Sequence, residues 1–373
     1  MLAKTPPMGF NTWNTFGENI SDKVIRELAD AIIEKGLDKA GYEYLVIDDC
    51  WSERERDPVT GKIVPSKEKF PEGMKAVSDY VHSKGLKFGM YSCDGTRTCA
   101  DYPGSFDHEF LDAETFAEYG ADFLKYDNCY RPEDSNGPYL YRRMGLALKA
   151  CGREILFSAC NWGCDEVHKW IRSAGAHMYR STGDINDSWI SMRDIALSQK
   201  ENLCYSAPGC FNDVDMLTCG MHNEGNVSST GCTDEEYRTE FALWCMYSAP
   251  LMLGSDIRKM DDTTLKLVTN KTLIRINQDE EARPPFIRNT DGGSTVFFKH
   301  LSNNEFALLF VNFDDCERWG RVYFDGLGIP ADTGYGLDLT DAYTGEHVGV
   351  KKEFWQFRLA GHDSRMYIGT LSK

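Results

Sequence analysis

Acidic side chains recur where short apolar runs of the sequence end. These residues are Asp48, Asp49, Asp94, Asp127, Asp184, Asp187, Asp213, Asp215 and Asp256. A single aspartate in such a place is most often the N-cap of the following helix. Several of them on one rim would instead line a cup with carboxylates, which accept hydrogen bonds and exchange protons.

Three kinds of chemistry use an acidic cup. Divalent-metal hydrolysis usually adds histidine, but only His177 and His222 lie near the predicted strand ends, without metal-binding spacing. Nucleotide binding needs glycine-rich phosphate loops, and the sequence lacks them. We therefore expect neither a metal nor a cofactor. Carbohydrate chemistry fits best, because carboxylates bind vicinal hydroxyls and a pair of them can cleave a glycosidic bond.

Aromatic residues stand at the same predicted strand ends. They are Trp13, Trp51, Tyr91, Tyr126 and Trp162. Such a ring can pack on the apolar face of a sugar, although each one alone is better explained by packing inside the protein.

Two carboxylates have neighbours that suit opposite roles. Lys125 and Asp127 are two residues apart on a predicted strand, so their side chains share a face. The ammonium should lower the pKa of Asp127 and keep it ionised, as a nucleophile requires. Asp184 follows Arg180 and would be the partner that burial and like charge hold protonated. A buried ion pair between Lys125 and another carboxylate is the structural alternative.

The elements that must position these residues alternate regularly. Eight short apolar runs lie at residues 8–13, 44–49, 87–92, 123–127, 155–160, 177–182, 203–206 and 249–255. They suit parallel strands buried on both faces, and amphipathic stretches separate them. The pattern predicts an α/β fold, a (β/α)8 TIM barrel with chemistry at the carboxyl ends of its strands. An open doubly wound sheet is the alternative, but no Gly-x-Gly-x-x-Gly follows any strand.

Capping residues mark where several of the intervening helices begin and end. Ser21 should cap one helix, and Thr233 with Glu236 should form a capping box for another. Pro71 suits the first turn of a third helix, which Gly85 should end.

After residue 281 the pattern changes to strands. Runs at 295–301, 305–313, 321–324, 353–359 and 366–371 are strand-like, and residues 302–304 suit a hairpin connection. We expect a catalytic barrel over residues 1–281 and an antiparallel β-sandwich domain over residues 282–373.

Composition limits the partners and the compartment. The 373 residues carry a net charge of −17, which disfavours nucleic acid and anionic membranes. The sequence contains no apolar run of about 18 residues that would suggest a membrane span. Thirteen scattered cysteines and no visible leader favour a cytoplasmic protein with buried thiols. A chain that begins after a removed leader would instead be secreted.

Eight segments, in order, resemble glycoside hydrolase family 27, the α-galactosidase and α-N-acetylgalactosaminidase family. They are TPPMGFNTW (5–13), YEY through IDDCW (42–51), KGLKFG (84–89), PGS (103–105), KYDNC (125–129), RSTGDI (180–185), NDVDML (212–217) and INQD (276–279). The resemblance spans nearly the whole chain and implies a barrel followed by an antiparallel β domain.

The resemblance also implies roles for individual residues. Asp127 would be the nucleophile and Asp184 the acid/base of a retaining double displacement, with about 5–5.5 Å between their carboxyl groups. Binding residues would be Trp13, Asp48, Asp49, Tyr91, Lys125, Arg180, Asp215 and Met216. The α-galactoside substrate would need neither metal nor cofactor.

The pocket for the sugar's 2-substituent should contain Cys160, Asn161 and Trp162. Vertebrate α-galactosidases carry glutamate at the Asn161 position, and α-N-acetylgalactosaminidases carry small residues there and nearby. The sequence Cys-Asn-Trp-Gly is similar to fungal α-galactosidases, which favours an unsubstituted 2-hydroxyl group.

The cysteines depart from the secreted members of the family. Cys99 and Cys129 match a pair that is disulfide-bonded there, but the usual partners of Cys50 and Cys160 are missing. This difference favours the cytoplasmic interpretation.

Other activities remain as alternatives. The same family includes α-N-acetylgalactosaminidases and β-L-arabinopyranosidases. A sugar-binding barrel without activity would have lost Asp127 or Asp184, and both are present. The sequence leaves open the natural aglycone and whether the chain forms a homo-oligomer.

Overall fold

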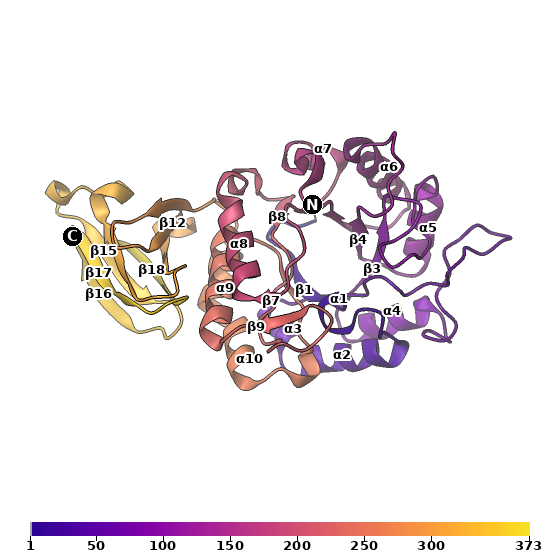
Figure 1. The fold of residues 1–373 in the computed structure, drawn as a ribbon, viewed down its shortest axis with the longest axis horizontal. Coiled ribbons are helices and arrows are strands. Elements are labelled where there is room, and N and C mark those ends of the chain that lie inside the picture. Colours follow the sequence, from indigo (N-terminus) through magenta and orange to yellow (C-terminus); the bar gives the residue numbers. More distant parts are fainter. Residues whose placement is uncertain (1) are drawn as a thin grey trace.

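Eight parallel strands form a barrel in the larger part of the molecule (Figure 1). The computed structural model describes residues 2–373. The barrel strands are β1 (Met8–Asn11), β2 (Tyr44–Val46), β3 (Lys87–Cys93), β4 (Phe123–Asp127), β5 (Leu156–Cys160), β6 (Met178–Arg180), β8 (Phe211–Asp213) and β10 (Leu251–Leu253). Their hydrogen-bonded order is β10-β1-β2-β3-β4-β5-β6-β8, and a parallel bridge between Leu217 and Leu253 closes the ring. The predicted barrel is confirmed.

The seventh predicted strand was misplaced. Leu203–Tyr205 forms a 3-10 helix, and the seventh barrel strand is β8. This strand carries a single large apolar residue, Phe211. The amide of Asn212 is buried because it donates a hydrogen bond to Gln199 at 2.8 Å. Because Asn212 is polar, β8 lacks the apolar run that marks the other barrel strands, and the contact that allows its burial cannot be read from the segment itself.

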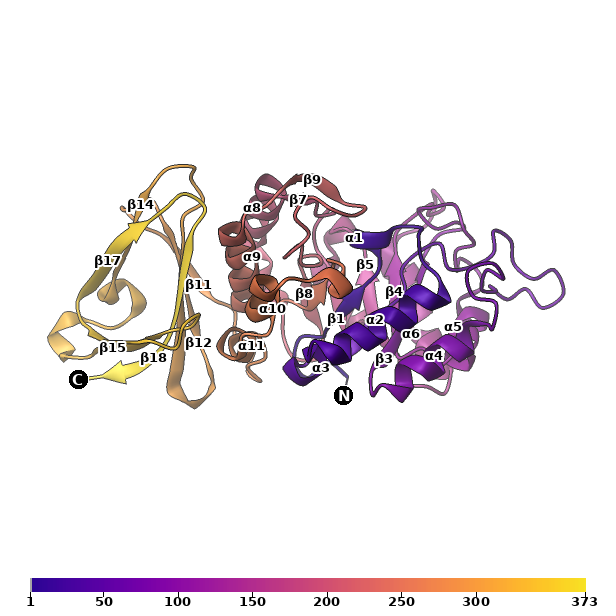
Figure 2. The ribbon, with the colours of Figure 1, turned by 90° about the horizontal axis from the view of Figure 1, so that it is seen from below.

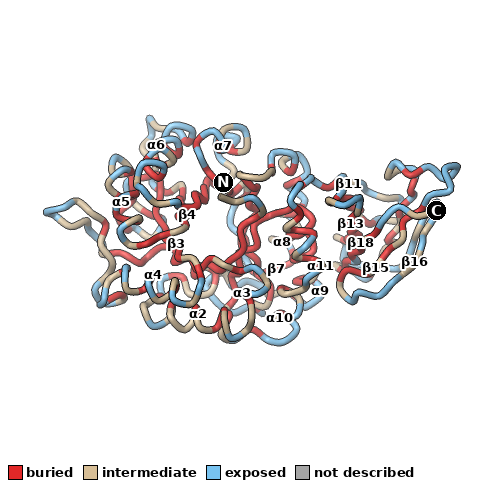
Figure 3. Tube along the Cα trace, turned by 180° about the vertical axis from the view of Figure 1, so that it is seen from behind, coloured by how far each residue is buried: buried red, intermediate tan, exposed pale blue. Residues whose placement is uncertain are grey.

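Helices surround the barrel, and their inward faces are buried (Figures 1 and 3). They are α1 (Trp13–Phe16), α2 (Asp22–Glu34), α3 (Leu37–Ala40), α4 (Met74–Ser83), α5 (Glu109–Glu118), α6 (Gly137–Ala150), α7 (Ile171–Ala174), α8 (Trp189–Ser198), α9 (Asp234–Tyr247), α10 (Asp262–Val268) and α11 (Lys271–Asn277). In residues 2–373 every helix is too short or too polar to cross a bilayer.

Most of the predicted helix ends are confirmed. The Ser21 side chain accepts a hydrogen bond from the Val24 amide, and Thr233 with Glu236 forms the capping box of α9. The prediction for Pro71 was wrong, because α4 begins at Met74. Residues 70–73 form a separate turn, which a hydrogen bond from the Gly73 amide to Phe70 closes at 2.9 Å.

The remaining strands lie mostly in the C-terminal part, which is yellow and orange in Figures 1 and 2. They are β11 (Phe286–Asn289), β12 (Thr295–His300), β13 (Glu305–Val311), β14 (Arg318–Tyr323), β15 (Gly336–Asp341), β16 (His347–Lys351), β17 (Phe354–Leu359) and β18 (Ser364–Ser372). A six-stranded antiparallel sheet, β11-β12-β13-β18-β15-β16, packs against the pair β14–β17 around an apolar core. This is the expected antiparallel β-sandwich.

The strand predictions for this part were incomplete. Five runs correspond to β12, β13, β14, β17 and β18, although β14 begins three residues before its run. Strands β11, β15 and β16 were not predicted, and β16 is a partly exposed edge strand without an apolar run. Residues 278–285 connect α11 to β11, and the boundary expected at residue 281 stays a prediction.

Two short strands lie outside the barrel sheet and the sandwich. Strand β7 (Asp187–Ser188) pairs with β9 (Ser228–Gly231) and joins the loops that follow β6 and β8. Val227, immediately before β9, thereby comes close to the end of the barrel.

Candidate active site

A pocket of about 500 Å³ of empty space opens at the carboxyl ends of the barrel strands. Eleven of the predicted site residues line it. They are Trp13, Asp48, Asp49, Tyr91, Lys125, Asp127, Trp162, Arg180, Asp184, Asp215 and Met216. These residues come from the ends of β1 to β6 and from the segment after β8, so the barrel brings together residues as far apart in the chain as Trp13 and Met216.

Asp127 ends β4, is buried and lines the pocket. The Tyr91 hydroxyl donates to its Oδ2 at 3.0 Å, and the Asn128 amide donates to its Oδ1 at 2.9 Å. Burial raises the pKa of Asp127 and outweighs the opposing effect of Lys125. The expected net lowering of this pKa was wrong, because burial of the carboxyl outweighs the charge of Lys125, whose ammonium is bonded to a different carboxylate.

That carboxylate is Asp48. The Lys125 Nζ and the Asn11 Nδ2 both donate to Asp48 Oδ2 at 2.7 Å. Burial disfavours the ammonium, but the hydrogen bond to Asp48 and the negative charges around the ammonium, that of Asp48 foremost, together raise the pKa of Lys125. Lys125 therefore belongs to a network with Asn11 and Asp48 and does not pair directly with Asp127. The structural alternative, an ion pair between Lys125 and another carboxylate, is confirmed.

Asp49 is held by backbone groups. Its carboxylate accepts from the Cys50 amide at 2.7 Å and from the Ala100 amide at 3.0 Å. Burial raises the pKa of Asp49 to about 6. The loop that contains Ala100 thus helps to fix one wall of the pocket.

Arg180 joins two carboxylates on the opposite wall. Its Nη2 lies 2.7 Å from Asp184 Oδ1 and 2.8 Å from Asp215 Oδ2. Arg180 is buried, whereas the Asp184 side chain is exposed. Partial desolvation of the carboxyl within the pocket acts to raise the pKa of Asp184, but the charges of Arg180 and Lys125 and the hydrogen bond from Arg180 lower it overall. The expectation of a protonated Asp184 is therefore wrong, because the guanidinium stabilises its ionised form.

Asp215 has an unusual backbone conformation. Its φ of 92° lies in the left-handed region, which is costly for a residue with a side chain. Amides of Ile185 and Met216 donate to its carboxylate at 2.7 Å, and the Trp244 indole donates to its carbonyl at 2.8 Å. These contacts hold the strained residue against Arg180, and burial raises the pKa of Asp215 to about 6.

Two predicted binding residues do not line the pocket. Cys160 lines a smaller cavity beneath it, and Asn161 lines neither. Asn161 is fully buried, and its side-chain atoms have no hydrogen-bond partner in the described chain. The next residue, Trp162, has a φ of 60° and does line the pocket. Because of this positive φ, the side chains that follow β5 do not alternate as they would in a continuing strand, and Trp162 rather than Asn161 lines the pocket.

Other residues of the predicted cup are structural. Asp94 pairs with Arg131 at 3.0 Å, and Asp256 caps a 3-10 helix. Asp213 accepts from the Asp215 amide, and Asp187 accepts from Tyr237. The aromatic residues Trp51 and Tyr126 are buried in the core.

Four residues of the pocket wall were not predicted as binding residues. They are Asn14, Cys99, Ile185 and Val227. Asn14 follows the predicted Trp13, and its Nδ2 is buried without a partner among the described residues, so it is free to donate to a ligand. Val227 is 14 residues beyond β8, where no local pattern marks it.

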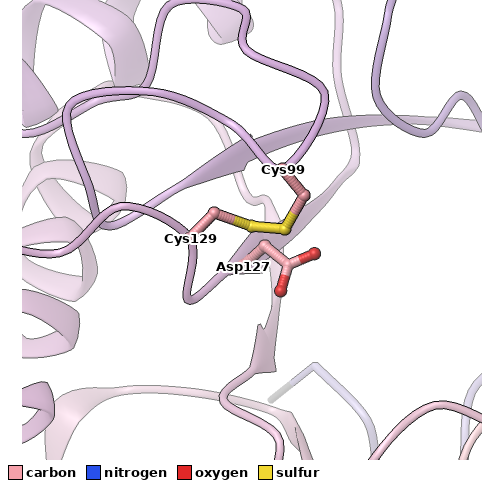
Figure 4. Close-up of side chains that lie close together, drawn as sticks. All are labelled: Cys99, Asp127 and Cys129. Atoms are coloured by element: carbon pink, nitrogen blue, oxygen red, sulfur yellow. A yellow bond between two sulfur atoms is a disulfide. The ribbon is translucent and has the colours of Figure 1, made fainter.

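Cys99 and Cys129 are joined by a disulfide. The bond connects the loop after β3 to the segment after β4, beside Asp127 (Figure 4). The other eleven cysteines are free, including the buried Cys50 and Cys160.

The model of the alpha galactosidase A family matches residues 5–279. The chain belongs to this family. The alpha-galactosidase of Cyamopsis tetragonoloba is 40% identical over 99% of this chain and 87% of its own. This membership confirms the resemblance to glycoside hydrolase family 27.

Solved structures of this family extend the likeness to the whole fold. Alpha-galactosidase I of Mortierella vinacea superimposes with a TM-score of 0.91 at 31% identity, covering 99% of this chain and 97% of that one. An alpha-galactosidase of Saccharomyces cerevisiae, solved with raffinose, superimposes with a TM-score of 0.88 at 26% identity, covering 100% of this chain and 98% of that one.

Proposed function

We propose that this protein is an exo-acting α-galactosidase that removes terminal α-linked galactose with retention of configuration. The observation that carries the proposal is one pocket that combines Asp127 and Asp184 with hydroxyl-binding carboxylates in a member of the alpha galactosidase A family. Buried side chains from several strand ends line the pocket, whereas Asp184 is exposed, and this arrangement suits a terminal sugar.

In the first step, Asp127 attacks the anomeric carbon while Asp184 protonates the glycosidic oxygen, and the aglycone leaves as an alcohol. Hydrogen bonds from Tyr91 and Asn128 orient the attacking carboxylate. The product of this step is a galactosyl ester of Asp127.

In the second step, Asp184 takes a proton from water as the water attacks the same carbon and displaces Asp127. Asp184 must therefore be protonated in one step and ionised in the next. A bound sugar removes water from Asp184 and raises its pKa, whereas ester formation removes the charge of Asp127 and lowers it again. The Arg180 pair favours the ionised form needed in the second step.

Substrate recognition is assigned to both walls. Asp48, Asp49 and Lys125 are proposed to bind the hydroxyls that distinguish galactose, and Arg180 to face the 2-position. The large Trp162 side chain on the wall supports a preference for an unsubstituted 2-hydroxyl.

Hydrolysis of three matched nitrophenyl glycosides tests this assignment. The α-galactoside should be cleaved much faster than the α-N-acetylgalactosaminide and the β-L-arabinopyranoside. The exposed Asp134→Asn variant should retain this activity, whereas Asp127→Asn should have none. Faster cleavage of either competing glycoside would reject the proposed substrate, and cleavage of none would reject the activity.

A further inference from the structure

The Cys99–Cys129 disulfide lies unusually close to a carboxylate of the pocket. The two sulfurs and a carboxylate oxygen of Asp127 lie within 4.8 Å of one another (Figure 4). While the disulfide is intact, its sulfurs carry no thiolate that could bind an ion. Reduction would place two thiols beside the proposed nucleophile.

Contacts other than the disulfide keep the two segments together. The Asp94 amide donates to the Asp127 carbonyl at 2.9 Å, and the Thr96 amide donates to the Tyr130 carbonyl at 3.3 Å. Gly95 packs so closely that an added Cβ would lie 1.8 Å from the Cys129 carbonyl oxygen. Both thiols should therefore remain near Asp127 after the bond opens.

The cluster is also accessible and acidic. Cys99 is exposed and lines the pocket, so a reductant and an ion can reach it. Asp49 adds negative charge, and the Lys125 ammonium, which opposes a cation, is paired with Asp48.

We propose that reduction converts Cys99, Cys129 and Asp127 into a site for a thiophilic divalent cation such as Zn²⁺. Two thiolates, one carboxylate and a water make a four-coordinate zinc site of ordinary composition. A bound ion would occupy the carboxylate that attacks the sugar, so it would inhibit the enzyme. The inhibition rests on the proposed function, whereas the ion binding does not.

The chemistry balances with a named reductant. A water-soluble phosphine supplies two electrons, takes the oxygen of one water and becomes its oxide, while the disulfide becomes two thiols. Each thiol then loses one proton as it binds the cation.

Cobalt binding tests the site directly. Reduced protein, freed of phosphine without oxygen, should bind one Co²⁺ more than oxidised protein and develop thiolate-to-cobalt absorption. The reduced Cys99→Ser/Cys129→Ser double variant retains the other eleven cysteines and should show neither change. Reduced Asp127→Asn should keep the absorption with weaker binding. Equal binding by reduced wild type and the double variant would overturn the site.

Zn²⁺ inhibition tests its consequence. Zn²⁺ should abolish galactoside hydrolysis by the reduced enzyme, and a chelator should restore it, while the oxidised enzyme stays active. If a reduced enzyme that binds Co²⁺ hydrolyses the galactoside equally fast with and without Zn²⁺, the proposed inhibition is wrong. A protein without hydrolytic activity in any state would reject the proposed function, and the cobalt absorption would still decide the site.

Discussion

The two proposed catalytic carboxylates have opposite surroundings. Asp127 is buried and oriented by the Tyr91 hydroxyl, whereas Asp184 is exposed and paired with Arg180. The buried group is held in one place for attack. The exposed group lies where the aglycone and then water must enter, which suits proton transfer to both.

Replacement of Asp184 should depend on the leaving group. Asp184→Ala should lower kcat/KM for an alkyl galactoside by about 10²- to 10⁴-fold, because the departing alkoxide needs a proton. A nitrophenyl galactoside needs little proton assistance and should lose far less in the galactosylation step. Steady-state kinetics with both substrates measures the difference, and equal losses would contradict the acid/base role.

The hydroxyl of Tyr91 should shift the acidic limb of the pH profile to lower pH. Its hydrogen bond favours the ionised form of Asp127 and so lowers that group's pKa, against the larger effect of burial. Tyr91→Phe should raise the pKa of Asp127. Because attack requires the carboxylate, the acidic limb of kcat/KM should move to higher pH, by about one unit for a charged hydrogen bond of about 1.5 kcal/mol.

A matched phenol elsewhere controls for this change. Tyr139→Phe alters an exposed residue of α6 and should leave the profile in place. A Tyr91→Phe profile that does not move, or moves to lower pH, would contradict the role of this hydrogen bond.

At the scale of elements, sequence patterns predicted what depends on local chemistry. The alternation of apolar runs predicted seven of the eight barrel strands, and Ser21 and Thr233 marked two helix starts. Strand β8 was missed because its burial depends on the partner of Asn212. Positions set by distant contacts leave no local signal.

The same limit applies to the site. Carboxylates at strand ends were predictable, because a barrel brings those ends together. The pKa directions were not, because they depend on how far burial desolvates Asp127 and on the contact of Arg180 with Asp184. Asn161 was predicted to line the pocket and does not, because a positive φ at Trp162 changes the path of the chain after β5. Val227 lines the pocket and was not predicted, because the pairing of β7 with β9 determines its position.

The capping box of α9 should have a measurable effect on stability. This helix carries Trp244, whose indole holds the Asp215 carbonyl. Thr233→Ala should lower the free energy of unfolding by about 1 kcal/mol, because it leaves a backbone amide of the first turn without its side-chain acceptor. Urea denaturation measures this, with the exposed Glu235→Ala on the same helix as a control that should change stability by less than about 0.5 kcal/mol. An equal loss of unfolding free energy in Thr233→Ala and Glu235→Ala would contradict the contribution of the capping box to stability.

At the scale of the whole molecule, a buried lysine joins the barrel helices to the sandwich. Lys299 of β12 donates to the Ser248 hydroxyl at 2.6 Å and to the carbonyls of Met246 and Ile276 at 3.2 and 3.3 Å. It thereby ties the carboxyl ends of α9 and α11 to the six-stranded sheet. Burial lowers its pKa to about 8.

This lysine should make stability depend on pH. Between about pH 8 and 10.5 the unfolded chain binds the proton more strongly than the folded protein, so stability should rise with pH in this window. Relative to Lys299→Met, wild type should gain up to about 3 kcal/mol of unfolding free energy. Denaturation at pH 7, 9 and 10.5 measures the difference. A constant or decreasing difference would contradict the lowered pKa.

The stereochemistry of the first product tests the proposed double displacement most directly. Proton NMR can follow the anomers released from a nitrophenyl α-galactoside before mutarotation mixes them. Two inversions at the same carbon, first by Asp127 and then by water, should release α-galactose first. Release of β-galactose first would mean a single displacement and would contradict the role of Asp127 as nucleophile.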